Sequence, residues 1–259
     1  MTRFCNLYSG SSGNSTYVEY KDTKILIDAG VSCQKIIKGL AQLNVTLDQI
    51  DGILITHEHS DHVKGLTTIS KKFNIPIYAT LKTWNQMSLL KLPEYNHVVF
   101  NANENFELGE LKIHPFSIPH DAIDPCAFHI TAGEKHITVA TDIGHVTKDI
   151  YENLLGSDIL LLESNYDPNT LSYSSYPYFL KKRISGDLGH LSNEMASKVI
   201  KKLYDDTGIH QIILGHLSKE NNFPELAYQT VVNAFGEMPT GFHLSVASRD
   251  NVDNAIILS

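Results

Sequence analysis

The sequence predicts an α+β fold, an αββα sandwich in which helices flank two β-sheets, with residues 1–259 forming a single domain. Short apolar runs rich in β-branched residues recur along the chain, and helical patterns lie between some of them. Two clusters of strands each lead into helices, the first ending near residue 79 and the second running from about residue 97 to 214. A sandwich with helices outside both sheets fits this order.

Only a hairpin-length turn separates the first two expected strands, which argues against a doubly wound parallel sheet. The expected strands are Thr16–Tyr20, Lys24–Asp28, Gly52–Thr56, Ile75–Ala79, His97–Phe100, Leu111–Ser117, Cys126–Thr131, His136–Thr141, Ile159–Glu163 and Gln211–Leu214. The expected helices are Ser32–Leu43, Val63–Phe73, Leu81–Leu89, Lys148–Leu155, Asn193–Thr207 and Glu225–Ala234. Asn193 is expected to be the N-cap of its helix and Gly208 the residue that stops it.

Composition indicates a large core and a reducing compartment. The chain is 42% hydrophobic, and its three cysteines are too few and too scattered for a disulfide framework. The opening segment has no apolar run of signal-peptide length, and no apolar stretch reaches the roughly 18 residues of a membrane span. We therefore expect a cytoplasmic protein that does not enter the membrane.

The charge balance is acidic, with a formal net charge of -8, so the protein as a whole does not present a basic face to nucleic acid. The chain also holds 13 histidines. Histidine is the commonest metal ligand, and acidic side chains supply oxygen ligands beside it. Composition thus favours a metal-binding protein.

The central motif is HEHSDH, which follows the apolar strand GILIT. Extended alternation would place His57, His59 and Asp61 on one side, and His62 can turn inward where a helix begins at Val63. One metal cannot easily accept four ligands from six adjacent residues, whereas two adjacent metals can share them. The motif therefore predicts two divalent metal ions.

More ligands are expected where later strands end. His120 follows one strand, Asp142 ends another where a carboxylate could bridge both ions, and His216 follows a third. Site residues collect on such loops because the strands hold them rigidly. Asp28 is expected to brace the metal loop rather than to bind metal.

These motifs resemble known proteins. HEHSDH followed by isolated His, Asp and His at strand ends is similar to the metallo-β-lactamase superfamily signature. Within that superfamily, SGSSGNS, ILIDAG, IPHDAIDP, GHLSNE and GHLSKENN resemble the WalJ/YycJ family. Members of that family are bacterial metal-dependent phosphodiesterases, described as 5′→3′ exonucleases on double-stranded DNA.

The resemblance implies a metallo-β-lactamase αββα fold, DNA as the substrate, and a division of the ligands. His57, His59 and His120 would hold one metal, Asp61, His62 and His216 the other, and Asp142 would bridge them. A hydroxide bridging the metals is the expected nucleophile, with Asp61 among the catalytic groups. His and Asp ligands accept zinc and manganese alike. The sequence leaves the oligomeric state open.

His190, in GHLSN, precedes an expected helix start, where backbone N–H groups attract phosphate. GHLSN also resembles a Gly-His-Ser segment that precedes a helix in related phosphodiesterases of the tRNA-processing type. The resemblance implies that His190 protonates the leaving oxygen or steadies the phosphate, although a capping or core histidine would look the same. Ser192 and Asn193 beside it are the expected substrate contacts, as is Asn14. Asn14 lies in the loop Ser9–Ser15, which is either a phosphate-facing nest of N–H groups or a tight hairpin turn.

A basic run, Lys181 to Arg183, follows several tyrosines in what the sequence suggests is one loop. It either tracks a nucleic-acid strand, through phosphate contacts and stacking of Tyr176 or Tyr178 on bases, or is a solvated charge run. The alternative function is a thiolester, lactam or small-phosphodiester hydrolase on the same fold. A purely structural metal site is disfavoured because such sites are mostly rich in cysteine.

Overall fold

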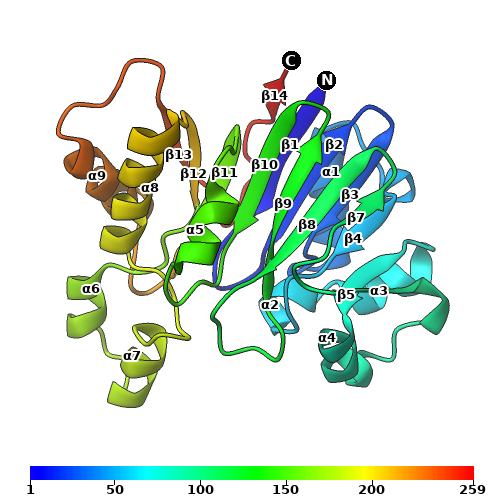
Figure 1. The fold of residues 1–259 in the computed structure, drawn as a ribbon. Coiled ribbons are helices and arrows are strands. Elements are labelled where there is room, and N and C mark those ends of the chain that lie inside the picture. Colours follow the sequence, from blue (N-terminus) through cyan, green and yellow to red (C-terminus); the bar gives the residue numbers. More distant parts are fainter. The chain divides into compact units, whose positions relative to one another are not determined.

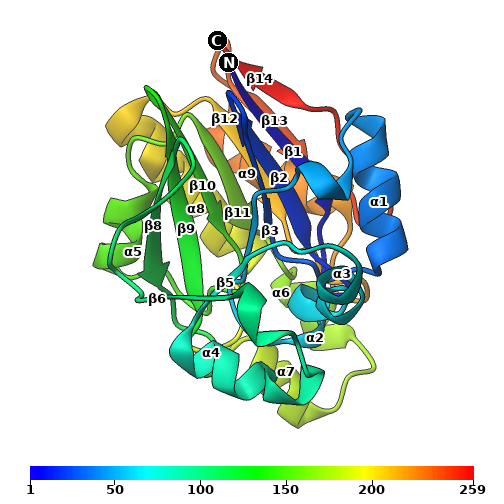
Figure 2. The same ribbon diagram turned by 90° about the vertical axis from the view of Figure 1, so that its right-hand side faces the viewer.

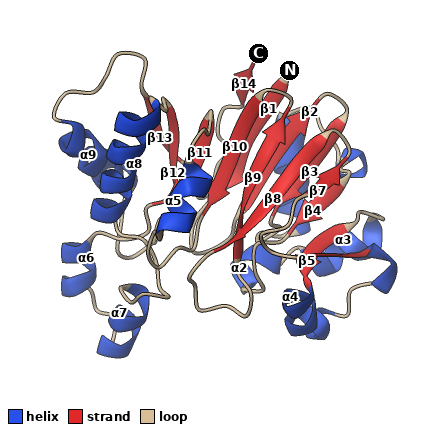
Figure 3. Cartoon of the chain, viewed as in Figure 1, coloured by secondary structure: helices blue, strands red, loops and turns tan.

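The strands form two mixed sheets flanked by helices in the computed structural model, which describes residues 1–259 (Figures 1 and 3). This confirms the predicted αββα fold class. Contacts within the chain divide it into two compact units. The first comprises Met1–Ser117, Ala122–Lys135 and Ser248–Ser259, and the second comprises Ile118–Asp121 and His136–Ala247. The single domain expected from the sequence stays a prediction.

The first unit contains a seven-stranded sheet in the order β14-β1-β2-β3-β4-β5-β6. Strands β14, β1, β2 and β3 pair antiparallel, and β3 to β6 pair parallel. Strands β7, β8 and β9 of the second sheet also belong to this unit and pair antiparallel. The strand bounds are β1 Thr2–Tyr8, β2 Ser15–Tyr20, β3 Thr23–Ile27, β4 Gly52–Leu54, β5 Ile77–Thr80, β6 His97–Phe100, β7 Phe106–Leu108, β8 Leu111–Ser117, β9 Cys126–Ala132 and β14 Ile256–Leu258.

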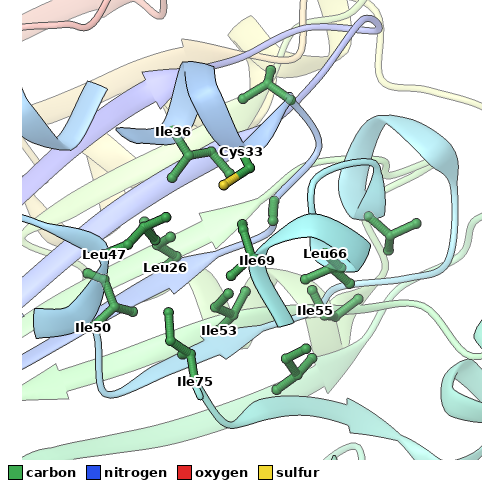
Figure 4. Close-up of a cluster of buried hydrophobic side chains, with 14 of the residues drawn as sticks. Leu26, Cys33, Ile36, Leu47, Ile50, Ile53, Ile55, Leu66, Ile69 and Ile75 are labelled. Carbon is green, nitrogen blue, oxygen red and sulfur yellow. The ribbon is translucent and has the colours of Figure 1, made fainter. Parts of the chain in front are cut away.

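Helices α1 and α3 cover one side of β1, β2 and β3 (Figure 2). In α1, Ser32 is the N-cap and accepts a hydrogen bond from the Lys35 N–H, while Ile36 and Leu40, one turn apart, are fully buried. They pack into an aliphatic cluster with residues of β3, β4 and α3 (Figure 4). This core fixes the end of β4, from which the HEHSDH loop leaves. The helices of this unit are α1 Cys33–Gln42, α2 Ser60–Val63, α3 Leu66–Lys72 and α4 Leu81–Gln86, with short 3-10 helices at Leu47–Gln49, Met87–Leu90 and Glu94–Asn96.

The second unit is built on four parallel strands, β10 to β13. The apolar sequences of β10, β11 and β12 are mostly buried, as expected for parallel strands that are covered on both faces, whereas β13 is partly exposed. Helices α8 and α9 pack together beside β12 and β13 (Figure 1). The elements are β10 Lys135–Ala140, α5 Lys148–Leu154, β11 Ile159–Glu163, α6 Pro168–Tyr173, α7 Tyr178–Ile184, α8 Asn193–Thr207, β12 Gln211–Gly215, α9 Pro224–Phe235 and β13 His243–Val246.

Several sequence-based expectations need correction. The strand expected over Gly52–Thr56 ends at Leu54, and the helix expected from Val63 is preceded by α2, which already contains Asp61 and His62. The N-cap of α8 is Ser192 instead of Asn193, while Gly208 ends the helix in the left-handed conformation as expected. None of the helices combines the length and apolarity that a membrane crossing requires.

Candidate metal centre

The HEHSDH loop of the first unit begins where β4 ends. Strand β4 pairs with β3 on one side and β5 on the other, so the point at which the loop leaves the sheet is fixed. His57 lies in the extended segment after β4, and His59 is the residue just before α2. His57 and His62 are fully buried. The predicted alternation of three ligands along one extended strand is wrong, because Asp61 and His62 lie in the short helix α2.

Asp28 joins the strand end to this loop. One carboxylate oxygen accepts a hydrogen bond from the Thr56 N–H at 3.0 Å, and the other lies 2.7 Å from Nδ1 of His62. The carboxylate therefore selects the Nδ1–H tautomer of His62, which leaves the lone pair on Nε2 for a ligand. The bracing role predicted for Asp28 is confirmed by these contacts.

The three imidazole rings of the loop lie against one another. The ring centroids of His57 and His59 are 4.6 Å apart, and those of His57 and His62 are 4.1 Å apart. Nδ1 of His57 lies 3.0 Å from Oγ1 of Thr56, an acceptor that suits the Nδ1–H tautomer. Rings this close cannot all be protonated without strong repulsion. Neutral imidazoles with the second nitrogen oriented by the protein are the form in which histidine binds a metal.

Asn14 packs against the same loop. Its backbone N–H donates to the Asp61 carbonyl at 2.8 Å, and its Nδ2 lies 3.2 Å from Nε2 of His62. The loop Ser9–Ser15 connects the antiparallel strands β1 and β2, and the Gly10 N–H donates to Oδ1 of Asn14. The loop is thus the connection of a β-hairpin, and the phosphate-facing nest stays a prediction. A substrate contact by Asn14 stays a prediction, and the side chain lies beside a predicted metal ligand.

The second unit collects its own donors at one edge of its parallel strands. Asp142 follows β10, Glu163 ends β11, and His216 follows β12. Because parallel strands have their carboxyl ends at the same edge, these three side chains meet. Nδ1 of His216 lies 3.0 Å from the Asp142 carboxylate and 3.1 Å from that of Glu163.

Left-handed backbone marks these strand ends. Asp28 and Asp142 both have φ of 62°, and His216 has φ of 53°. Non-glycine residues rarely adopt this conformation, and such residues cluster at functional sites when the surroundings enforce it. Three predicted or bracing site residues share this feature in two separate units.

His120 belongs to the same unit and is buried. Its Nδ1 lies 3.1 Å from the Gly189 carbonyl, and its Nε2 lies 3.8 Å from the Asp142 carboxylate. Burial lowers the pKa of His120, an effect that the nearby Asp142 partly offsets. The ring is therefore held neutral, with the lone pair on Nε2.

Glu163 is the residue that sequence reasoning missed. It is fully buried, and its Oε1 lies 2.7 Å from Nδ1 of His190, while its Oε2 accepts from the N–H groups of Ile143 and Leu191. Burial alone would raise the pKa of the carboxyl, but the rings of His190 and His216 outweigh burial and hold that pKa well below its ordinary value. The signal in the sequence is a carboxylate at the end of an expected apolar strand, like Asp142.

His190 joins this cluster. The ligand atoms of Asp142, Glu163, His190 and His216 all lie within 4.8 Å of one another. The His190 ring is one-fifth exposed, whereas the His216 ring is buried. The backbone N–H of His190 donates to the Ile184 carbonyl at the end of α7. His190 is thus the histidine of this cluster that solvent reaches best.

Ser192 and Asn193 have local partners. Oγ of Ser192 accepts from the Met195 N–H as the cap of α8. Asn193 is fully buried and exchanges hydrogen bonds with Ser164 and Asn222. Their substrate role stays a prediction, and these contacts give it no support.

Comparisons with known proteins show which protein family the chain belongs to. A sequence profile described as "Beta-lactamase superfamily domain" matches residues 23–217, a span that includes all the predicted metal ligands. The chain belongs to this superfamily. Within it, the chain is 39% identical over 244 residues to exodeoxyribonuclease WalJ of Streptococcus pneumoniae, covering 92% of this chain and 90% of that protein. It is 35% identical over 240 residues to exodeoxyribonuclease YycJ of Bacillus anthracis, with the same coverage.

The fold comparison agrees. The metallo-β-lactamase fold protein YhfI from Bacillus subtilis superimposes with a TM-score of 0.73 at 16% identity, covering 97% of this chain and 98% of that one. The predicted resemblance to the metallo-β-lactamase superfamily and its WalJ/YycJ family is confirmed. Superfamily membership and the clustered His and Asp donors together indicate that the protein binds divalent metal.

Proposed function

We propose that the protein is a metal-dependent exodeoxyribonuclease that degrades double-stranded DNA in the 5′→3′ direction. Its relatives WalJ and YycJ, 39% and 35% identical, are named exodeoxyribonucleases and match over most of their length. The observation that carries the proposal is the Glu163–His190 pair in the cluster that contains Asp142 and His216. Phosphodiester cleavage expels an alkoxide, which needs a proton, and this pair is built to deliver one.

We further propose that two divalent ions, zinc or manganese, are held by the seven ligands that the sequence predicts. The imidazole and carboxylate donors suit both metals, and the tautomers fixed by Asp28, Thr56 and Gly189 leave ligating nitrogens on their histidines. Bound divalent ions supply Lewis-acid stabilisation of the phosphate and lower the pKa of the attacking water. The ligand set is His57, His59, Asp61, His62, His120, Asp142 and His216.

The protein's own residues do the rest of the chemistry. Glu163 accepts a hydrogen bond from Nδ1–H of His190 and so orients the ring, which leaves Nε2 to deliver a proton to the leaving oxygen. His190 is neutral once it has given up its proton, and it regains one from solvent, which reaches the ring, before the next turnover. The hydrogen bond from its backbone N–H to the Ile184 carbonyl fixes where the residue leaves the chain. A thiolate leaving group would need no such proton donor, so the thiolester alternative is not better supported.

We place the protein in the cytoplasm, with duplex DNA as its partner. Cys5, Cys33 and Cys126 are all unpaired and buried. Unpaired thiols suit a reducing compartment.

End-labelled substrates test the activity. Purified protein is stripped of metal by chelation, and Mn²⁺ or Zn²⁺ is added back with duplex DNA, single-stranded DNA or RNA. We expect metal-dependent release of nucleotides from the 5′ end of duplex DNA. Intact duplex DNA alongside rapid thiolester hydrolysis would overturn the nuclease proposal and leave only the fold.

Elemental analysis tests the metal site. We expect about two ions per chain, and a lower ratio in an Asp142→Ala variant because the proposed bridge is lost. A ratio near one that Asp142→Ala leaves unchanged would contradict the two-ion proposal.

A further inference from the structure

A pocket lies in the same unit as Glu163 and His190, between α6 and α7. It encloses about 500 Å³, and its lining residues include Tyr166, Tyr176, Tyr178, Lys181 and Lys182. Volumes of this order are typical of pockets that take a small ligand group. The two short helices are joined across the pocket by a hydrogen bond from Nζ of Lys181 to the Ser172 carbonyl at 2.6 Å, and they lie together in both views (Figures 1 and 2).

Helix α7 packs little of its surface against the rest of the chain. None of its residues is buried, and Tyr178 and Phe179 are 74% and 73% exposed. Folding gains little from such a helix, and neighbouring exposed aromatic rings mark binding surfaces. Nζ of Lys182 lies 5.7 Å from the centroid of the Tyr178 ring, which holds a cation beside that ring.

The basic run divides into two parts with different contacts. Lys181 and Lys182 line the pocket, whereas Arg183 is hydrogen-bonded to Asp121, the residue next to His120. Pocket cations are therefore supplied by the two lysines alone. Aromatic rings with adjacent cations are the combination that binds nucleic-acid strands, rings on bases and cations on phosphates.

The pocket is connected to the catalytic cluster through α7. Ser185 lines the pocket, and the carbonyl of the preceding residue, Ile184, holds the backbone N–H of His190. A Cβ on Gly189 would lie 2.2 Å from that same carbonyl, so only glycine permits this close approach. On the other wall, the backbone carbonyl of Tyr166 accepts a hydrogen bond from the N–H of Asn193, the first residue of α8.

We propose that this pocket binds the base of one nucleotide of the DNA strand near the scissile phosphate, with Tyr178 and Tyr176 stacking on it and Lys181 and Lys182 contacting the adjoining phosphate. The proposal rests on the proposed nuclease function and adds where the strand is held. It also explains why a surface helix without buried residues carries an exposed tyrosine beside a lysine, Tyr178 and Lys182. A base is flat and apolar on both faces, and an acidic protein needs local cations to retain a polyanion.

The test is a cycle of paired changes in the protein and the DNA. Duplex substrates carry one abasic site at each of the first few nucleotides from the 5′ end, and the metal-loaded enzyme is compared with Tyr178→Leu and Tyr176→Leu variants. With intact DNA, each variant should raise KM about 5- to 100-fold. With wild-type enzyme, one abasic position should raise KM by a similar factor, and the two changes together should add little further.

Matched controls exclude general effects. Tyr173→Leu removes a 90% exposed tyrosine of α6 outside the pocket, and we expect no change in KM. Lys201→Ala with Lys202→Ala removes a neighbouring lysine pair of α8 that faces Asp205 and Asp206, and it should leave KM unchanged where Lys181→Ala with Lys182→Ala raises it.

A small diester without any aromatic ring, two abasic deoxyribose units joined by one phosphate, separates this proposal from the proposed function. Its hydrolysis should be the same in wild type and Tyr178→Leu, because it has no base to stack. If KM is the same at every abasic position, or if the abasic and tyrosine effects on KM are fully additive, the base-binding role of the pocket is overturned. The nuclease function still stands in that case, provided that the enzyme degrades DNA. Equal loss of both activities in the tyrosine and lysine variants also overturns the pocket, since α7 would then only support the site. Absence of DNA degradation by wild type overturns the nuclease function itself.

Discussion

At the scale of single residues, Glu163 organises the histidines of the second unit. Its two oxygens receive contacts from His190, His216 and two backbone N–H groups, so every lone-pair direction of a buried carboxylate is used. Such an arrangement tolerates no exchange of an acceptor for a donor, because a carboxamide would present N–H₂ to groups that themselves donate.

We therefore predict that Glu163→Gln lowers turnover of DNA by about 10- to 100-fold, as do other changes behind metal ligands. Steady-state kinetics and metal analysis measure it. Glu152→Gln, an exposed carboxylate of α5, is the matched control and should behave as wild type. Turnover as fast as in the control would contradict the role of Glu163.

His190 gives a second prediction at this scale. His190→Ala should cut turnover of DNA by about 10²- to 10⁴-fold while leaving the metal content intact, because it removes a proton donor and not one of the proposed ligands. A nucleotide ester with a good leaving group should be hydrolysed at a partly restored rate, since that group leaves without a proton. Loss of metal, or an unchanged rate, would return His190 to a structural role.

The roles of single residues could be predicted from the sequence only where the residues form a local motif. The HEHSDH motif shows its ligands within six adjacent letters. Glu163 meets His190 and His216 at separations of 27 and 53 residues, so no local pattern links them. Asp142 could be predicted because it follows an expected apolar strand, where a carboxylate could bridge two ions, and the family resemblance then implied the same role.

At the scale of elements, the helices and strands that could be predicted are those that bury a regular stripe of apolar side chains. Helix α8 has Ala196, Ile200 and Leu203 buried on one face, and its predicted range is correct. Helix α7 has no buried face, so its sequence lacks the periodic apolar stripe that reveals a helix. The sequence therefore predicts a loop at this segment. Strand β1 pairs with β14 from the far end of the chain, a partnership that local sequence does not contain.

The turn from β4 into α2 carries a prediction of its own. Asp28 joins β3 to this turn through Thr56 and His62, and both contacts require an acceptor. Asp28→Asn replaces one acceptor by a donor and should shift His62 toward the Nε2–H tautomer, which cannot bind a metal through Nε2. We expect metal affinity to fall about 10- to 100-fold, measured by competition with a coloured chelator.

Asp48→Asn is the control for that change, since Asp48 is an exposed carboxylate of the same unit. The melting temperature of each metal-free variant should be recorded as well, because a buried carboxylate also contributes to folding. Unchanged metal affinity in Asp28→Asn would show that the loop holds its ligands without this brace.

At the scale of the whole molecule, charge sets how DNA is held. The formal net charge is -8, and the pocket between α6 and α7 offers two lysines. On duplex DNA, log affinity falls against log salt with a slope of about -0.9 for each phosphate neutralised. Two lysine contacts therefore predict a shallow slope of about -2 for the whole protein.

Replacing Lys181 and Lys182 with alanine should flatten this slope by between about one and two, whereas the Lys201 and Lys202 replacements should leave it unchanged. Fluorescence anisotropy of a labelled duplex across a salt series measures it, with Ca²⁺ in place of the reactive metals to prevent cleavage. The acidic remainder of the surface repels the backbone, so contacts beyond the pocket and the metal site add little. A wild-type slope steeper than about -6 would mean that a broad basic surface holds the DNA. The negative net charge would then not describe the local charge of the surface that binds DNA.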